Sequence, residues 1–146
     1  MGEPVVTYEL AGPVAWLTIN RPAARNALNK AVRDGLFDSV RAFNADDGAR
    51  VLVLTGAGDQ AFCAGADLKE MAQTGLRVPP PDFAPQFGRN IEVAKPVIAA
   101  VNGAAYAGGF LLAQSATCAW PRSTRGSRSP RPRWAGAHRG RRRCRG

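Results

Sequence analysis

The chain has 146 residues, 45% of them apolar, and a formal net charge of +9, which fits at most one domain with a buried core. Its three cysteines and single histidine lack the spacing of a metal site, so we expect no bound metal. No apolar run is long enough to cross a membrane, and no basic start precedes an apolar segment at the N-terminus, so we expect a cytoplasmic protein rather than a membrane-bound or secreted one.

The first third of the chain predicts a β-hairpin followed by a helix with one buried face. Residues 5–10 and 14–19 are rich in strand-forming residues and are separated by Gly12-Pro13, a pattern typical of two strands joined by a turn. Asn29 can cap a helix, and we expect residues 46–48 to end it. Apolar residues recur between them with helical spacing, namely Val32, Leu36, Phe37, Val40 and Phe43.

The stretch from Val51 to Met71 predicts a buried strand, a loop of small residues and a second helix. The strand ends at residues 55–58, which are Thr-Gly-Ala-Gly, and the helix opens near Asp67. Small residues let a ligand approach the backbone, and the N–H groups at a helix start have no partner within the helix. Such N–H groups can stabilise an oxyanion, although a plain packing turn accounts for the same pattern.

A second unit of the same kind covers residues 96–113. Residues 96–103 predict another buried strand, and the glycine-rich residues 104–109 lead into the apolar helix start at 110–113. In a parallel sheet, two such units bring two sets of free N–H groups to the same edge. The sequence therefore favours a backbone oxyanion hole.

The segment between the two units has no regular apolar pattern at its start. Residues 75–88 are rich in proline and predict an irregular surface loop. We expect a short helix over about residues 84–94, before Lys95-Pro96 begins the next strand.

Four blocks of the sequence, taken together and in this order, resemble the crotonase superfamily, the enoyl-CoA hydratase/isomerase family. The resemblance implies an α/β fold, a ββα spiral of which only the N-terminal half is present. It assigns residues 1–114 to an acyl-CoA-binding domain and leaves 115–146 as a disordered tail or one read out of frame. The blocks are residues 17–22 with 26–29, 51–56, 61–71 and 95–109.

The resemblance also implies a catalytic site. The N–H groups of Ala66 and Gly108 would polarise the carbonyl of an acyl-CoA thioester, so that CoA is part of the substrate and no separate cofactor is expected. The positions that match the family's CoA contacts are Ala64, Ala66, Asp67, Leu68 and Lys69, and more weakly Ala24, Arg25 and Ala27. Lys69 would lie near the adenosine end of CoA, although Lys69 and Arg25 are equally explained as exposed surface charges.

The family's chemistry implies further groups that this sequence does not show. Hydration needs an activated water and a proton donor, for which the hydratases use two glutamates, and the first position is Leu111 here. The resemblance predicts an enoyl-CoA hydratase or isomerase acting on a fatty acyl-CoA. The alternative is an inactive remnant that at most binds CoA esters. Family members form trimers or hexamers through C-terminal helices that the sequence lacks.

The last residues carry all of the net charge. Residues 121–146 hold ten arginines and no acidic residue, so residues 1–120 carry ten basic against eleven acidic residues, a formal charge of −1. One interpretation is a disordered basic arm that binds nucleic acid, with Trp120 and Trp134 stacking on bases. We do not expect nucleic acid to be the main partner.

The interpretation that we favour for the tail is a frameshift. Read from the third base of the Ser115 codon, with degenerate bases chosen freely, the tail is compatible with a sequence that resembles the continuation of crotonases. That reading places a glutamate at the codon that straddles Pro130 and Arg131, where the second carboxylate of the family belongs.

Overall fold

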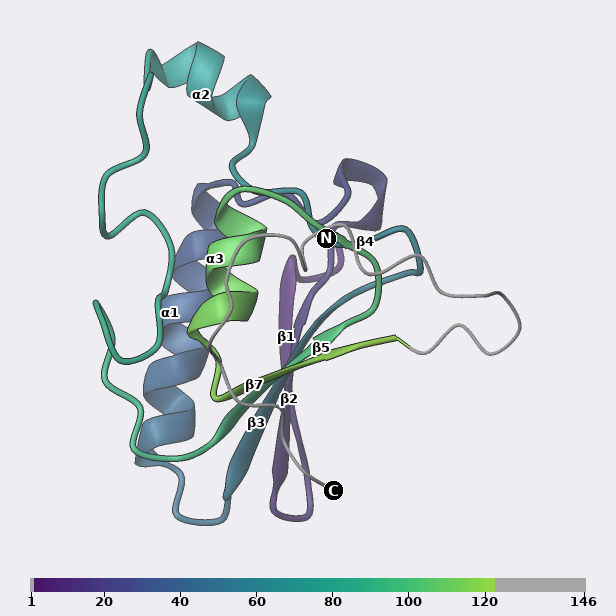
Figure 1. Ribbon diagram of the computed structural model, residues 1–146, viewed down its shortest axis with the longest axis vertical. Helices are drawn as coiled ribbons and strands as arrows, with labels where there is room; N and C mark the ends of the chain where they lie inside the picture. Colours follow the sequence, from purple (N-terminus) through teal and green to yellow (C-terminus); the bar gives the residue numbers. More distant parts are fainter. Residues whose placement is uncertain (1, 123–146) are drawn as a thin grey trace, which may run out of the picture.

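The main sheet is built almost in chain order (Figure 1). The first two strands form an antiparallel hairpin, and each later strand adds in parallel to the previous one. The computed structural model describes residues 2–122. Within them the sheet order is β1 (Val6–Ala11), β2 (Val14–Ile19), β3 (Val51–Gly56), β5 (Val97–Val101) and β7 (Cys118–Pro121).

Two helices lie along one face of this sheet, and a third stands apart at the top of Figure 1. The long helix α1 (Lys30–Ala45) and the short helix α3 (Gly108–Ser115) cover the face, whereas α2 (Leu68–Thr74) projects beyond the core. A single 3-10 turn, η1 (Pro22–Ala24), follows β2. A separate two-stranded parallel sheet joins β4 (Ala61–Cys63) to β6 (Ala104–Ala105).

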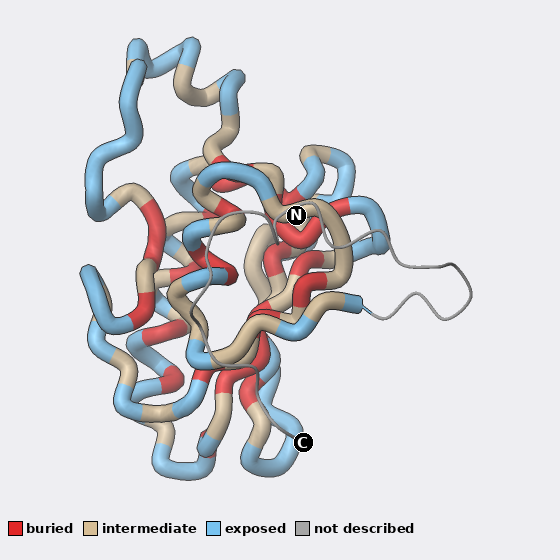
Figure 2. Tube along the Cα trace, in the orientation of Figure 1, coloured by how far each residue is buried: buried red, intermediate tan, exposed pale blue. Residues whose placement is uncertain are grey.

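The core lies between α1 and the covered face of the sheet, where the buried segments of Figure 2 gather. Strand β2 alternates as its pleat requires, so that every second residue faces the helix. Four helix residues at helical spacing meet these strand residues and are themselves buried. The buried residues of the two elements are Val32, Leu36, Val40 and Phe43 of α1 and Ala15, Leu17 and Ile19 of β2.

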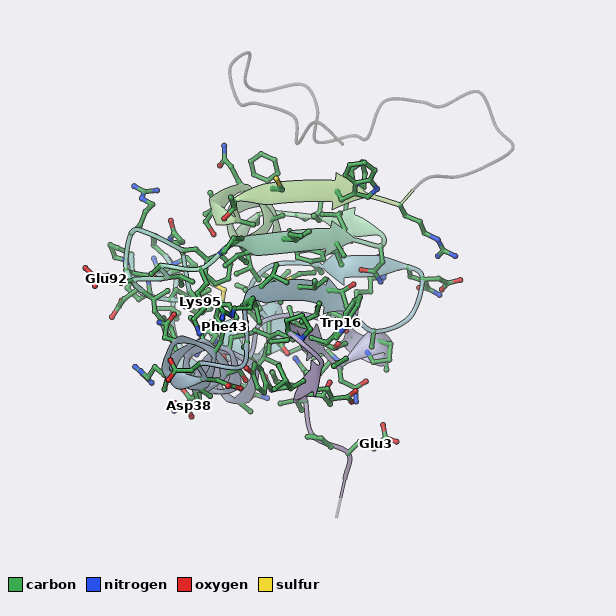
Figure 3. All side chains as sticks on the ribbon, turned by 90° about the horizontal axis from the view of Figure 1, so that it is seen from below. Glu3, Trp16, Asp38, Phe43, Glu92 and Lys95 are labelled. Carbon is green, nitrogen blue, oxygen red and sulfur yellow. The ribbon has the colours of Figure 1, made fainter. Side chains whose placement is uncertain are left out.

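Both ends of α1 are satisfied by side chains, at the boundaries that the sequence predicts. Oδ1 of Asn29 accepts a hydrogen bond from the N–H of Val32 at 3.0 Å and so caps the first turn. At the other end, the Lys95 ammonium donates to the carbonyl oxygens of Phe43 and Asp46. Its nitrogen also lies 4.8 Å from the centre of the Phe43 ring (Figure 3).

The helix predicted over residues 84–94 is wrong. The segment forms turns joined by one isolated bridge between Phe87 and Ile91. The Asn90 side chain is the physical reason, because it takes over backbone hydrogen bonds. It accepts from the N–H of Gln86 at 2.8 Å and donates to the carbonyl oxygen of Ala84 at 2.9 Å.

Regular structure continues past residue 114, where the sequence predicts the domain to end. Helix α3 runs to Ser115, and β7 then pairs with β5 as the edge strand of the sheet. Thr117 supports this pairing, since its hydroxyl accepts a hydrogen bond from the N–H of Val97 at 3.1 Å. Most of the predicted tail, residues 123–146, lies outside the described residues. Among residues 2–122, no helix is long and apolar enough to cross a membrane.

Candidate functional site

Two loops that the sequence assigns to ligand binding are joined by their backbones. The loop that follows η1 and the loop that follows β4 run side by side, and Leu28 and Ala66 form a parallel bridge. The N–H of Ala64 donates to the carbonyl oxygen of Arg25 at 3.0 Å, and that of Leu28 donates to Gly65 at 2.8 Å. The structure therefore brings both sets of predicted CoA contacts to one place.

Asn26 holds the first of these loops, although no sequence pattern assigned it a role of its own. It is fully buried and has a left-handed backbone with φ +56°, a conformation that asparagine tolerates better than most residues. Its side-chain amide donates to the carbonyl oxygens of Ala57 and Ala61 at 2.9 and 2.8 Å. Its side-chain oxygen accepts from the N–H of Arg21 at 3.0 Å. The Asn26 side chain thus ties the loop to the β3–β4 connection.

The N–H groups of Ala66 and Gly108, the predicted pair, lie close together. A Cβ added to Gly65, whose φ is +92°, would lie 3.2 Å from the nitrogen of Gly108. A Cβ added to Gly108 would lie 3.9 Å from the nitrogen of Ala66. Among residues 2–122, neither of the two N–H groups donates a hydrogen bond. Because a backbone N–H without a partner is uncommon, this adjacent pair is open to an acceptor from outside the chain.

The residue before Gly108 has a strained backbone. Ala107 caps α3 with φ 44° and ψ −115°, a combination that costs a residue with a Cβ on the order of 1–3 kcal/mol. The ψ angle of Ala107 sets the direction of the next N–H group, which is that of Gly108. Strain at this position therefore fixes the orientation of one candidate donor.

Gly109 lets α3 come very close to β4. A Cβ at this position would lie 2.2 Å from the carbonyl oxygen of Cys63 and 2.7 Å from its Cβ. Gly108 has ordinary room, since the nearest atom to its added Cβ would be Leu28 Cδ1 at 3.4 Å. The second glycine of the pair is thus required for packing, and the first is not.

The start of α2 is anchored by Asp67. Its carboxylate accepts from the N–H groups of Lys69 and Glu70 at 3.1 and 3.3 Å and from Nη1 of Arg21 at 3.0 Å. Burial opposes ionisation of Asp67, but these hydrogen bonds and the Arg21 charge outweigh it and hold its pKa below the usual value.

One turn later, Glu70 ties α2 to the start of α1. Its carboxylate accepts from the N–H of Lys30 and from Nη1 of Arg33, both at 2.7 Å. Burial again opposes ionisation, and the two donors outweigh it, so the pKa of Glu70 lies below its usual value. The Arg33 guanidinium also stacks on the Phe83 ring, 4.1 Å from its centre.

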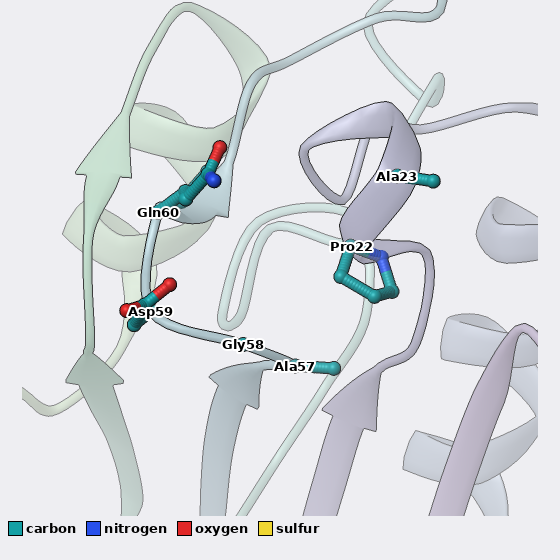
Figure 4. Close-up of a pocket in the computed structure, with 7 residues that line it drawn as sticks. Pro22, Ala23, Ala57, Gly58, Asp59 and Gln60 are labelled. Carbon is teal, nitrogen blue, oxygen red and sulfur yellow. The ribbon is translucent and has the colours of Figure 1, made fainter.

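Two hollows in the described surface lie away from the paired N–H groups. The first, of about 270 Å³, lies between η1 and the connection from β3 to β4 and is lined by Pro22, Gly58 and Gln60 among others (Figure 4). The second, of about 400 Å³, lies between Arg33 and Leu76. Within residues 2–122, no three His, Cys, Asp or Glu side chains are grouped as metal ligands.

The family model for enoyl-CoA hydratase/isomerase matches residues 9–119, well over half of the chain. The chain belongs to the enoyl-CoA hydratase/isomerase family. It is 44% identical over 116 residues to crotonyl-CoA hydratase of Syntrophomonas wolfei, covering 74% of this chain and 43% of that protein. It is 46% identical over 101 residues to 2,3-dehydroadipyl-CoA hydratase of Escherichia coli, covering 68% of this chain and 39% of that protein.

Solved structures of the family share its fold. Enoyl-CoA hydratase EchA1 from Mycobacterium marinum superposes with a TM-score of 0.72 at 40% identity, covering 82% of this chain and 46% of that chain. The chain therefore spans less than half the length of the family members that it matches. The predicted α/β, crotonase-like fold and the N-terminal position of the match are confirmed.

The remaining positions carried over from the family differ in accessibility. Arg25, Leu68 and Lys69 are exposed, and neither cation forms an ion pair within residues 2–122. Ala27 is buried, and its carbonyl oxygen is held by Arg21 at 2.8 Å. Ala24 and Ala64 are half-buried.

Leu111 lies in the first turn of α3, with 45% of its surface exposed. Its side chain cannot move a proton. In this family member, the position where the resemblance implies a carboxylate is therefore apolar.

Proposed function

We propose that this chain contributes the oxyanion-hole half of an enzyme that acts on acyl-CoA thioesters, with enoyl-CoA hydratase or isomerase chemistry. The observation that carries the proposal is the adjacent pair of N–H groups at Ala66 and Gly108, neither of which donates a hydrogen bond within residues 2–122. When a thioester carbonyl accepts both, negative charge that develops on its oxygen during addition or enolisation is stabilised. Each such donor contributes roughly 2.7–4 kcal/mol where one has been removed by mutation.

The rest of CoA would lie along the two joined loops. Arg25 and Lys69 are exposed cations without an ion-pair partner in residues 2–122, which suits them to the phosphates of CoA. The half-buried Ala24 and Ala64 leave the backbone accessible between them. CoA enters as part of the substrate, and the mechanism proposed here uses no separate cofactor.

The carboxylates of these loops are poorly suited to acid–base catalysis. Asp67 and Glu70 are already engaged by two backbone N–H groups and one, respectively, and each also by an arginine. Their lowered pKa values make them weak bases, and Leu111 offers no proton. We therefore expect binding and carbonyl polarisation with slow hydration, since each missing acid–base group costs roughly 10²–10⁴ in rate.

Butanoyl-CoA labelled with ¹³C at the thioester carbonyl tests the proposed site, because this saturated ester cannot be hydrated. The chain should bind it and lower its carbonyl stretching frequency relative to the free ester. In Gly108→Ala, the new methyl group has room to fit but stands beside both N–H groups, so the frequency shift should shrink. Gly48→Ala, in the turn before β3, serves as the matched control. Binding without any shift in the wild-type chain would refute the oxyanion hole.

An assay with crotonyl-CoA distinguishes an active enzyme from a remnant that binds CoA esters without turning them over. Loss of its conjugated absorption reports hydration. A rate near that of ordinary hydratases would show that the chain needs neither carboxylate, whereas binding with no turnover would support the binding remnant.

A further inference from the structure

The guanidinium of Arg21 links the two loops of the site. Arg21 follows β2, and its single nitrogen Nη1 donates to the carbonyl oxygen of Ala27 at 2.8 Å and to Oδ2 of Asp67 at 3.0 Å. Ala27 lies in the loop after η1, and Asp67 lies in the loop after β4. One atom of one side chain therefore connects segments that are 40 residues apart in the sequence.

Both acceptors of Arg21 are next to groups that determine where the Ala66 N–H points. Asp67 is the next residue after Ala66, and its own N–H donates to the carbonyl oxygen of Leu28 at 3.3 Å. Ala27 precedes Leu28, whose N–H donates to Gly65. The peptide that carries the Ala66 N–H is thus flanked on both sides by groups that Arg21 holds.

The ion pair between Arg21 and Asp67 is largely shielded from solvent. The side chains of Arg21 and Asp67 are 21% and 14% exposed, whereas the surface pair of Arg41 and Asp38 on α1 is 67% and 76% exposed. Sheltered charges are screened less by salt and water than exposed ones. In agreement with this, the pKa of Asp67 lies below its usual value: burial opposes ionisation, but the hydrogen bond and charge of Arg21, together with the two backbone N–H groups, outweigh it.

We propose that Arg21 is a positioning residue that holds the Ala66 N–H against the thioester carbonyl by clamping the two loops together. This rests on the proposed oxyanion hole. Arg21 contacts neither Gly108 nor Ala66 through a hydrogen bond; it acts through Ala27 and Asp67.

The test compares Arg21→Met, Arg21→Lys and the control Arg41→Met in the full chain. Arg21→Met should weaken binding of ¹³C-labelled butanoyl-CoA about tenfold and abolish most of the carbonyl frequency shift, with a smaller change in affinity for free CoA. Because one nitrogen serves both acceptors, the single ammonium of Arg21→Lys should restore much of the shift. Arg41→Met should behave like the wild-type chain.

A purely structural ion pair predicts a different result. Arg21→Met would then lower the unfolding midpoint but leave the frequency shift of the bound ester unchanged, which would overturn the proposal. If Arg21→Met does not fold, Asp67→Asn decides, because asparagine still caps α2 through its side-chain oxygen, whereas an NH2 group replaces the Oδ2 atom that accepts from Arg21. Retention of the full shift in Asp67→Asn would also overturn it.

A measurement without ligand separates this proposal from the proposed function. The ¹⁵N order parameter of the Ala66 amide should fall in Arg21→Met and stay unchanged in Arg41→Met. If the wild-type chain fails to bind butanoyl-CoA but this order parameter falls, the acyl-CoA function is wrong and the clamp is supported. If the order parameter does not change, the proposed role of Arg21 is wrong, whatever the result of the butanoyl-CoA measurements.

Discussion

A single methyl group at Ala107 costs stability at the start of α3. With φ 44° and ψ −115°, the backbone at this residue suits glycine, so Ala107→Gly should raise the free energy of unfolding by about 1 kcal/mol after glycine's own entropy cost. Urea denaturation measures this change. Ala42→Gly, at an ordinary helical position in the last turn of α1, is the matched control and should lower stability by about 0.5 kcal/mol. The two Ala→Gly substitutions should therefore change the free energy of unfolding in opposite directions. A decrease at both sites would contradict the strain at Ala107.

Asn26 is the buried polar residue on which the loops depend. Asn26→Ala would leave two carbonyl oxygens and one N–H without their partners, so we expect a loss of about 3 kcal/mol in the free energy of unfolding. Asn44→Ala provides the control, because the Asn44 amide makes one exposed hydrogen bond, to the carbonyl oxygen of Glu92. This substitution should lower the free energy of unfolding by about 0.5 kcal/mol. A loss at Asn26 no larger than that at Asn44 would show that water replaces the amide.

At the residue scale, the sequence motifs point to the two proposed donors but not to the groups that hold their loops. Ala66 and Gly108 were predictable, because each stands where a loop of small residues leads into a helix. The roles of Asn26 and Arg21 depend on partners 31 to 46 residues away, and no local periodicity carries such information. The strain at Ala107 was equally hidden, since alanine is an ordinary helix residue.

At the scale of elements, helix α2 is held by two carboxylates and should respond to acid. Asp67 and Glu70 have lowered pKa values in the folded chain, so the folded state binds fewer protons than the unfolded state below the usual carboxyl pKa of about 4. Their stabilisation is complete above that pH and is lost as the pH falls through the lowered values. Unfolding followed across this range should show a smaller acid loss for Asp67→Asn with Glu70→Gln than for the wild-type chain.

The contact between α3 and β4 depends on the absence of one side chain. In Gly109→Ala, the new methyl would overlap the backbone of Cys63, so α3 must move away from β4 or the chain loses about 3 kcal/mol of stability. Thermal unfolding and ester binding should both fall. Gly108→Ala, one residue earlier, should unfold at nearly the wild-type temperature, and equal destabilisation by both changes would contradict the packing described here.

The type of an element could be predicted where its apolar pattern was long, and the prediction failed where the pattern was short. The sixteen-residue α1 has four buried residues at regular spacing and a capping asparagine, which fixed its type and both ends. The segment around Gln86 lacks such a pattern, and the Asn90 side chain decided its conformation instead. The four-residue β7 exists because β5 offers a free edge, a cause that lies outside its own sequence.

At the scale of the whole molecule, the charge is distributed very unevenly. Residues 1–122 hold as many basic as acidic residues, so all of the +9 belongs to residues 123–146. The full chain should bind a polyanion such as heparin with strong salt dependence, and a chain ending at residue 122 should not. Butanoyl-CoA binding should survive this deletion because β7 is kept. If polyanion binding persists after residues 123–146 are deleted, the polyanion binds to residues 1–122.

Sequencing the encoding DNA across codons 110–146 tests the frameshift. We expect a one-base change that restores the frame with the glutamate at codons 130–131. The family match ends at residue 119, and the chain covers only 39–43% of the length of two of its relatives, which is consistent with this interpretation. A frame that stands as written would favour the basic arm instead.

The order of the strands has a consequence for synthesis. Because β2, β3, β5 and β7 each add to the edge left by the previous strand, each of these four strands finds its partner already synthesised when it leaves the ribosome. Chains are synthesised from the N-terminus at about 5–20 residues per second, which is slow compared with hairpin formation in about 1–10 μs. The β1–β2 hairpin can thus act as a template, and the sheet can grow as a vectorial process, one strand at a time, while translation continues.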